Sequence, residues 1–169
     1  MIYFALDASA LAKRYVAEPG SAVIDYLLTA LPTDRLYCLT LGALETFSIV
    51  VRARNSGRIT DGTFIEAIQR LRREVFLGDA RLLSAPDSLI LRSDLLVQTH
   101  NINANDAIFL RALLDIRPTL QGSDDDLVLL ASDLRLLRAA RLEGLPTFNP
   151  EAADLATHWA LAGLSQDGQ

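Results

Sequence analysis

The strongest constraint on the fold is the way short apolar runs alternate with segments of helical periodicity. The run "IYFAL" at 2–6 is continuous and apolar, which is typical of a strand buried on both faces. Similar runs occur at 36–40, 80–85 and 127–132, and "PTF" at 146–148 is a candidate for a short last strand. Strands that alternate with helices need right-handed crossovers. We therefore predict an α/β sandwich with a mostly parallel sheet of four or five strands, covered by helices on both faces.

Capping residues and apolar stripes place helices between these runs. Ser21 is expected to cap one helix, and Asp61 opens a long helix with Phe64 and Ile68 on its apolar stripe. The stretch 117–126 predicts a loop. Helices are expected at about 9–17, from Ser21 toward residue 30, after the run 36–40 and ending near residue 55, between Asp61 and Gly78, from Pro86, at 101–116, at 133–143 and from Pro150. Residues 163–169 are expected to form a frayed tail.

Length and composition limit the classes of protein that this chain can represent. Its 169 residues suit a single domain, which we assign to 1–162, and no apolar stretch approaches the length of a membrane span. Because no secretion signal is recognisable, we expect a cytoplasmic protein. The single cysteine, Cys38, rules out an intrachain disulfide and a four-cysteine zinc site. The net charge of −5 argues against a broad cationic surface for nonspecific binding of nucleic acid.

Acidic residues follow several of the predicted strands at the same end. Asp7 comes directly after the first run, Asp133 lies just past 127–132, and Glu45 lies in the first turns of the helix after 36–40. The carboxyl ends of parallel strands share one edge of a sheet, where ligands bind in such folds. We therefore expect these three carboxylates at one edge.

Helical periodicity adds a fourth acid. Asp106 shares a stripe with Leu110, opposite Arg111, and Asp133 aligns in the same way with Leu137. Each acid taken singly is also a good helix cap, since carboxylates stabilise helix N-termini. Four acids at one edge repel one another, however, and capping does not explain why they converge.

A divalent cation such as Mg²⁺ accounts for that convergence, because it takes carboxylate and water ligands. Such a site suits phosphodiester hydrolysis: the metal lowers the pKa of a bound water and offsets the charge that develops on the phosphate.

Four segments resemble the successive motifs of the PIN-domain family, in particular the VapC-type toxins of bacterial toxin–antitoxin modules. They are "LDASALAKRYVAEPGS", "LETFSIV", "NANDAIFLRALL" and "LASDLRLLRAARLEGL", and the match covers residues 3 to about 149. The resemblance implies a PIN-like three-layer α/β/α sandwich. It also implies a Mg²⁺- or Mn²⁺-dependent ribonuclease that is often a homodimer and is inhibited by a cognate antitoxin.

The resemblance also implies roles for particular residues. The catalytic, metal-binding acids would be Asp7, Glu45, Asp106 and Asp133, with Ser9 and Ser132 at the supporting hydroxyl positions. The family pattern contains no activating histidine, and we interpret His100 and His158 as structural. The gap between the third and fourth acids is longer than usual and carries three aspartates. We interpret these as part of a solvated loop, with Asp126 at the wrong edge of the sheet for the metal.

Three cations are candidates for holding phosphate. Arg52 shares a stripe with Glu45, and Lys13 and Arg14 follow Asp7 by about two helical turns. The simpler interpretation of each is a solvated surface charge without a specific role.

Two other functions compete with the nuclease. A phosphoaspartyl protein, either a haloacid-dehalogenase-like phosphatase or a receiver domain, would also place an aspartate after the first strand. The phosphatase needs a second acid at the position of Ser9, and the receiver needs a lysine late in the chain, whereas the only lysine is Lys13. A non-catalytic PIN-fold binding module is the third hypothesis, and the presence of all four acids argues against it.

Overall fold

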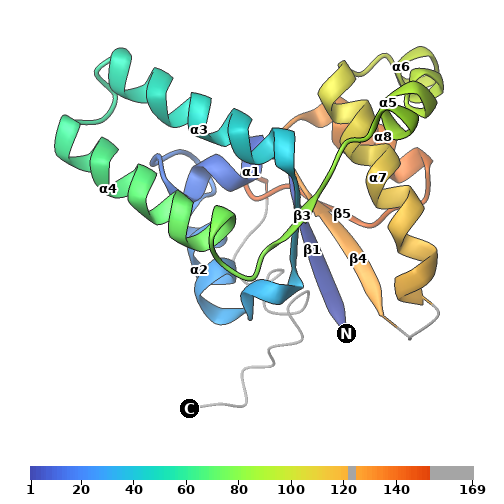
Figure 1. Cartoon of the computed structure of the whole chain (residues 1–169), viewed down its shortest axis with the longest axis horizontal. Coiled ribbons are helices and arrows are strands. Elements are labelled where there is room, and N and C mark those ends of the chain that lie inside the picture. Colours follow the sequence, from blue (N-terminus) through green and yellow to red (C-terminus); the bar gives the residue numbers. More distant parts are fainter. Residues whose placement is uncertain (122–124, 153–169) are drawn as a thin grey trace.

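The computed structural model describes residues 1–121 and 125–152. Within them the strands form one five-stranded sheet in the order β3-β2-β1-β4-β5, and all of its pairs are parallel (Figure 1). This confirms the predicted α/β class. The strands are β1 (Ile2–Leu6), β2 (Leu36–Leu39), β3 (Arg81–Leu83), β4 (Asp126–Leu130) and β5 (Thr147–Phe148).

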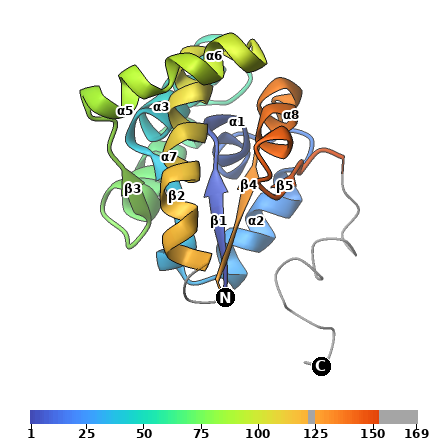
Figure 2. The same ribbon diagram turned by 90° about the vertical axis from the view of Figure 1, so that its right-hand side faces the viewer.

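Helices cover both faces of the sheet, which gives the three layers expected (Figure 2). The first layer contains α1 (Ala8–Leu11), the 3₁₀ helix η1 (Ala12–Arg14), α2 (Ser21–Ala30), α3 (Thr40–Asn55), α4 (Asp61–Leu71) and the π-helical turn η3 (Arg72–Phe76). The second contains α5 (Asp87–Arg92), α6 (Asp94–His100), α7 (Ala104–Gln121) and α8 (Leu134–Leu142). A short 3₁₀ helix, η2 (Thr33–Arg35), precedes β2.

The core is divided by the sheet into two clusters. Alternate residues of β1 serve opposite sides: Phe4 and Leu6 pack with the first layer, whereas Ala5 packs with the second. Central strands buried on both faces have continuous apolar sequences, which is why they were recognisable.

The register of the central strands places the acids. Leu6 of β1 is paired with Leu130 of β4, and the backbone N–H of Asp7 donates to the carbonyl of Leu130 (2.9 Å). Asp7 and the segment after β4 therefore lie side by side at the carboxyl edge of the sheet. Asp126 is paired with Ile2 at the opposite edge, as predicted.

Two helix boundaries differ from the prediction. The loop expected at 117–126 is wrong for its first part, because α7 continues through Pro118 to Gln121. Ile116 and Leu120 pack against the second core cluster, and this packing outweighs the helix-breaking tendency of proline. The single helix expected from Pro86 is interrupted at Ser93 and forms α5 and α6.

Two further corrections concern helix ends. Ser21 is the first residue of α2 rather than its cap: Gly20 occupies that position at φ +84°, and the Ser21 hydroxyl accepts from the N–H of Glu18. The helix expected from Pro150 is a turn as far as Ala152, and the remainder lies outside the described residues, as does the expected frayed tail.

Among the helices of the described ranges, none combines the length and the hydropathy that a bilayer span requires.

Candidate active site

Asp7 occupies the N-cap of α1, directly after the central strand. Its Oδ2 accepts hydrogen bonds from the backbone N–H of Ser9 (3.0 Å) and from the Ser9 hydroxyl (2.6 Å). Burial raises the pKa of Asp7, the bonds from Ser9 offset part of this, and the charge of Asp133 adds to it. Asp7 is thus a desolvated carboxylate whose hydrogen-bond partners are neutral.

Asp106 lies in the first turn of α7 and is 7% exposed. Asn103 holds it at both ends: its Oδ1 accepts from the Asp106 backbone N–H (2.9 Å), and its Nδ2 donates to Asp106 Oδ2 (2.8 Å). Burial, together with the charges of Asp7, Asp133 and Glu45, raises the pKa of Asp106 to about 7. All three of the other predicted acids therefore lie close enough to disfavour its ionisation.

Asp133 has the capping role that was weighed against metal binding. It is the N-cap of α8, and its Oδ1 accepts from the backbone N–H groups of Arg135 (2.7 Å) and Leu136 (3.2 Å). Its Oδ2 lies 3.8 Å from the Arg135 guanidinium, and the side chain is 30% exposed. One carboxylate oxygen, Oδ1, is thus used in the cap, whereas Oδ2 has only the distant contact with Arg135 among the described residues.

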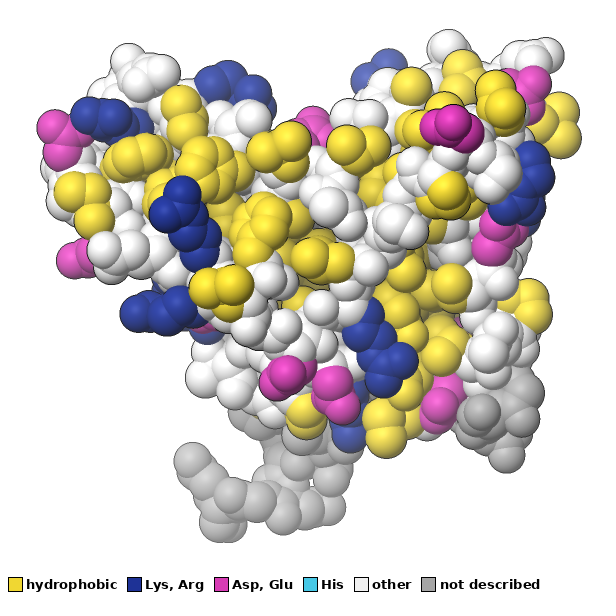
Figure 3. Space-filling view, in the orientation of Figure 1, with side chains coloured by type: hydrophobic (Ala, Val, Ile, Leu, Met, Phe, Trp, Pro, Cys, Tyr) yellow, Lys and Arg dark blue, Asp and Glu magenta, His cyan; other side chains and the backbone are white. Residues whose placement is uncertain are grey.

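Glu45 reaches the edge from α3. With Asp7, Gly42 and Asn105 it lines a hollow of about 10 Å³, which is room for a single water or ion. Figure 3 shows the surface notched between the α3–α4 arm and the α5–α6 lobe, with hydrophobic side chains on both flanks. Asp7 and Glu45 thus line one small hollow at the carboxyl edge of the sheet.

The chemistry of these donors fits a hard divalent cation, since all are oxygen atoms and no described basic side chain is paired with Asp7, Glu45 or Asp106. In the described ranges, however, no three acidic, histidine or cysteine side chains lie close enough together to hold one ion. A four-acid metal centre therefore stays a prediction, and full coordination requires these side chains to move closer together.

The two predicted hydroxyl residues connect the central strands. The backbone N–H of Ser132 donates to Ser9 Oγ (3.0 Å), which in turn donates to Asp7 Oδ2. Ser132 Oγ makes no hydrogen bond of regular geometry, although it is among the groups that hold the pKa of Glu151 low. Two hydrogen bonds thus connect the segment after β4, through Ser9, to the first acid, Asp7.

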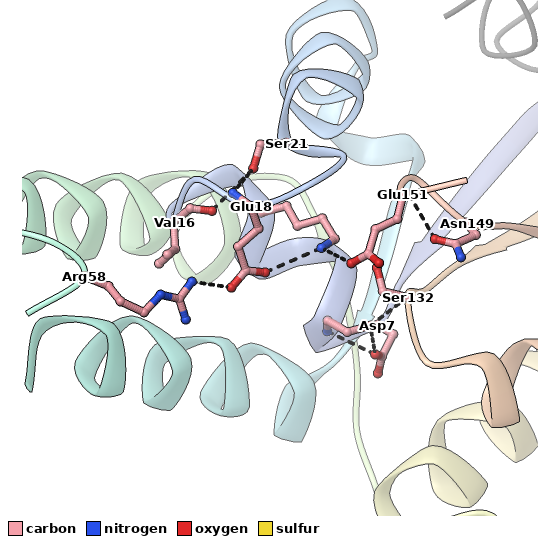
Figure 4. Close-up of polar contacts among 10 residues, drawn as sticks. Asp7, Val16, Glu18, Ser21, Arg58, Ser132, Asn149 and Glu151 are labelled. Atoms are coloured by element: carbon pink, nitrogen blue, oxygen red, sulfur yellow. Dashed lines mark hydrogen bonds and ion pairs between the residues drawn. The ribbon is translucent and has the colours of Figure 1, made fainter. Parts of the chain in front are cut away.

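Lys13 and Arg14 are not solvated surface charges, and that interpretation is wrong for both. The side chain of Lys13 is 2% exposed, and its Nζ contacts Glu151 (2.6 Å) and Glu18 (3.5 Å) (Figure 4). Arg14 is 7% exposed and paired with Asp25 and Glu74. Their role in holding phosphate remains an untested prediction.

Arg52 differs from these two cations, because it lies exposed on α3, the helix that carries Glu45. It is the candidate phosphate contact that is open to solvent.

The structure describes one of the two histidines and two of the three aspartates of the predicted loop. His100 is buried and its Nε2 lies 2.7 Å from Glu143. Asp125 contacts the N-terminal amino group (2.6 Å). His158 and Asp124 lie outside the described residues.

Two functional candidates were missed from sequence. Asn105 lines the hollow with Asp7 and Glu45, and its place beside Asp106 in "NAND" was the available signal. Glu151 pairs with Lys13 across 138 positions of sequence, and nothing in the local pattern indicates such a long-range contact.

No protein-family model and no curated protein sequence matches this chain. Solved structures do match. PAE2754 from Pyrobaculum aerophilum is 18% identical, with a TM-score of 0.63 over 96% of this chain and 99% of that one. FitAcB from Neisseria gonorrhoeae is 18% identical, with a TM-score of 0.58 over 89% and 99%. VapC20 from Mycobacterium tuberculosis, described as a toxin that cleaves the sarcin–ricin loop, is 14% identical, with a TM-score of 0.55 over 80% and 94%.

These likenesses establish the fold. The chain has a PIN-like α/β fold, as its sequence motifs predicted.

Proposed function

We propose that the chain is a metal-dependent endoribonuclease and the toxin component of a toxin–antitoxin system. One observation carries the proposal: Asp106 is buried near three further acids at the carboxyl edge of the sheet, and no described basic side chain is paired with it. A fold that gathers unneutralised carboxylates at its ligand-binding edge is suited to a cation that arrives from solution.

The residues at this edge would have different roles: some would bind the metal, others orient these ligands, and one would contact RNA. Asp7, Glu45, Asp106 and Asp133 would hold Mg²⁺ or Mn²⁺, which supplies an activated water and neutralises charge on the phosphate. Ser9 orients Asp7 Oδ2 through two hydrogen bonds, and Asn103 orients Asp106 through a reciprocal pair. Arg52 would contact the backbone of RNA.

Partners are proposed on the same basis. VapC20 is described as a toxin that cleaves the sarcin–ricin loop, and a matching FitAB structure is bound to a DNA fragment. By analogy we propose RNA as the substrate, a cognate antitoxin as the inhibitor and a homodimer as the assembly. Two exposed leucines, Leu44 on α3 and Leu91 on α5, offer apolar surface for protein partners.

The phosphoaspartyl alternative is disfavoured by the position of the lysine. A receiver domain needs a lysine that pairs with the phosphoacceptor aspartate. The only lysine here, Lys13, is committed to Glu18 and Glu151.

The test is cleavage of RNA by the purified protein with Mg²⁺ or Mn²⁺. Asp7→Asn and Asp106→Asn are expected to abolish cleavage while preserving the far-UV circular dichroism spectrum. Asp61→Asn is the matched control, because this aspartate is 77% exposed and its carboxylate pairs with Arg54. Cleavage that persists in either site variant, or that needs no divalent cation, overturns the proposal.

A further inference from the structure

The turn formed by residues 149–152 is fixed against the first layer of the molecule. Asn149 Oδ1 accepts from the backbone N–H of Glu151 (2.9 Å), and the N–H of Ala152 donates to the Asn149 carbonyl (3.2 Å). The backbone of Pro150 approaches Gly20 so closely that a Cβ there would lie 2.6 Å from the Pro150 carbonyl oxygen. This contact and the φ of +84° both require glycine at position 20.

An ion pair between a buried ammonium group and a more exposed carboxylate joins this turn to the segment after Asp7. Lys13 is the only lysine of the chain and lies in η1, six positions after Asp7. Its ammonium group is removed from water and contacts the Glu151 carboxylate at 2.6 Å (Figure 4). The hydrogen bond from Lys13 lowers the pKa of Glu151. A buried ammonium requires such a partner, because an unpaired charge is costly to bury.

The same carboxylate lies beside the acidic edge. Ser132 is among the groups that stabilise the charged form of Glu151. The Ser132 N–H donates to Ser9 Oγ (3.0 Å), and Ser9 Oγ donates to Asp7 Oδ2 (2.6 Å). Figure 4 shows Glu151, Ser132 and Asp7 following one another across the end of the sheet. Hydrogen bonds thus connect Ser132 to the first acid, and Glu151 lies next to Ser132 at the other end of this series.

We propose that Glu151 and Lys13 are positioning residues for the acidic site. The ion pair holds the turn against Ser132, which fixes Ser9 and thereby the direction of Asp7 Oδ2. The inference rests on the proposed function, since it assigns to these residues the placement of a metal-binding carboxylate.

The second partner of Lys13 provides a matched control. Glu18 also contacts Lys13, at 3.5 Å, and it binds Arg58 at 2.6 Å on the side away from Ser132 (Figure 4). Loss of either glutamate removes one carboxylate from Lys13, but only the loss of Glu151 affects the contacts that lead to Asp7.

The experiment compares Glu151→Gln with Glu18→Gln in the full chain. Calorimetric titration with Mn²⁺ is expected to show about tenfold weaker binding for Glu151→Gln, within the range for residues that orient a metal ligand, and less than twofold for Glu18→Gln. In RNA cleavage, Glu151→Gln should lower kcat at saturating Mn²⁺ and leave the KM for RNA within twofold. Glu151→Asp should restore part of the Mn²⁺ affinity, since it keeps the charge.

Hydrogen exchange gives a readout that needs neither metal nor substrate. The Ser132 amide should exchange faster in Glu151→Gln than in Glu18→Gln, because the turn no longer holds it on Ser9. Lys13→Met is a second variant, which should reproduce the Glu151→Gln phenotype.

The outcomes separate the two proposals. Wild-type protein that binds Mn²⁺ and cleaves RNA, with Glu151→Gln no different from Glu18→Gln, overturns the positioning role alone. Wild-type protein that neither binds Mn²⁺ nor cleaves RNA overturns the proposed function and with it this inference.

Discussion

Two regions of the molecule hold carboxylates that are buried or partly buried, and the charge of the carboxylate is neutralised in only one of them. Glu74 accepts from Arg14 (3.1 Å), Arg70 (2.9 Å) and the Tyr15 hydroxyl (3.1 Å). Burial by itself would raise the pKa of Glu74, but hydrogen bonds and charges from the two arginines outweigh it and the pKa is lowered. Among the residues that the structure describes, the Asp106 carboxylate has only the amide of Asn103 as a hydrogen-bond partner, and the pKa of Asp106 is raised to about 7.

The difference separates structural from functional carboxylates. The Glu74 cluster is internally neutralised and joins η1, α2 and η3. The acidic edge has four carboxylates and, apart from the distant contact of Asp133 with Arg135, no described cation paired to them. The chain therefore can neutralise a buried acid with its own arginines, and it does not do so at the edge where a metal is proposed.

The largest expected effect is on catalysis. Asp106→Asn should lower RNA cleavage by more than about 100-fold, since the loss of groups that merely orient metal ligands already costs up to that much. Glu74→Gln should leave cleavage within about threefold of wild type, because its partners are structural. Single-turnover kinetics with Mn²⁺ measures the cleavage rate of both variants. Equal losses of cleavage in the two would contradict the distinction between functional and structural carboxylates.

Stability should respond in the reverse order. Glu74→Gln leaves Asp25 as the one described carboxylate paired with Arg14. It should lower the free energy of unfolding by about 2 kcal/mol, below the full cost of breaking a buried pair because Glu74 is 28% exposed. Asp106→Asn should leave the free energy of unfolding unchanged or raise it at pH 8 without metal, since it removes an ion that its neighbours destabilise. Urea denaturation of both variants at pH 8 tests this prediction. An Asp106→Asn protein less stable than Glu74→Gln would contradict the account.

The pH dependence of stability should have opposite signs at the two regions. The native state retains the Asp106 proton up to a pKa of about 7, whereas its ordinary value is 3.8. Stability contributed through Asp106 therefore falls as pH rises between these values. Because the pKa of Glu74 is lowered, its ionised form stabilises the native state at pH values above its ordinary pKa of 4.5. This contribution is lost as the pH falls.

Without metal, the Tm of the wild type should thus decline more between pH 4 and pH 8 than the Tm of Asp106→Asn. Thermal unfolding of both proteins over this pH range measures the difference. Mn²⁺ should raise the Tm of the wild type more at pH 8 than at pH 5, because protons compete with metal for the carboxylates. A metal-induced rise in Tm that is equal at both pH values would count against a carboxylate site.

The smallest expected effect concerns RNA contact on α3. Arg52→Ala should weaken RNA binding and reduce the slope of log affinity against log salt by about one, as expected for one lost phosphate contact. Arg54→Ala on the same helix is the control, since Arg54 already pairs with Asp61 and lies over Phe64. Identical salt slopes for wild type and Arg52→Ala would remove Arg52 from the interface.

Local patterns predicted much of this architecture. The run 2–6 was recognisable as a strand because residues on both of its faces are buried, and it matches β1. Asparagine is a favoured residue at helix N-termini, and Asn103 Oδ1 does accept from the backbone N–H of Asp106. Such features depend on neighbours within a few positions of sequence.

What depended on distant packing was not predictable. The continuation of α7 past Pro118 is stabilised by contacts of Leu120 with other elements. Lys13 was interpreted as a solvated charge, because its partner Glu151 lies 138 positions away in the sequence. The approach of the acids was inferred from strand order, whereas their separation depends on side-chain conformations that no periodicity encodes.

The most direct test of the central claim is the anomalous difference map of a crystal soaked in Mn²⁺. We expect a peak at the carboxyl edge of the sheet, about 2.1 to 2.3 Å from carboxylate oxygens of both Asp7 and Asp106 and with further ligands from Glu45, Asp133 or water. A peak elsewhere, or none at saturating Mn²⁺, would contradict the account.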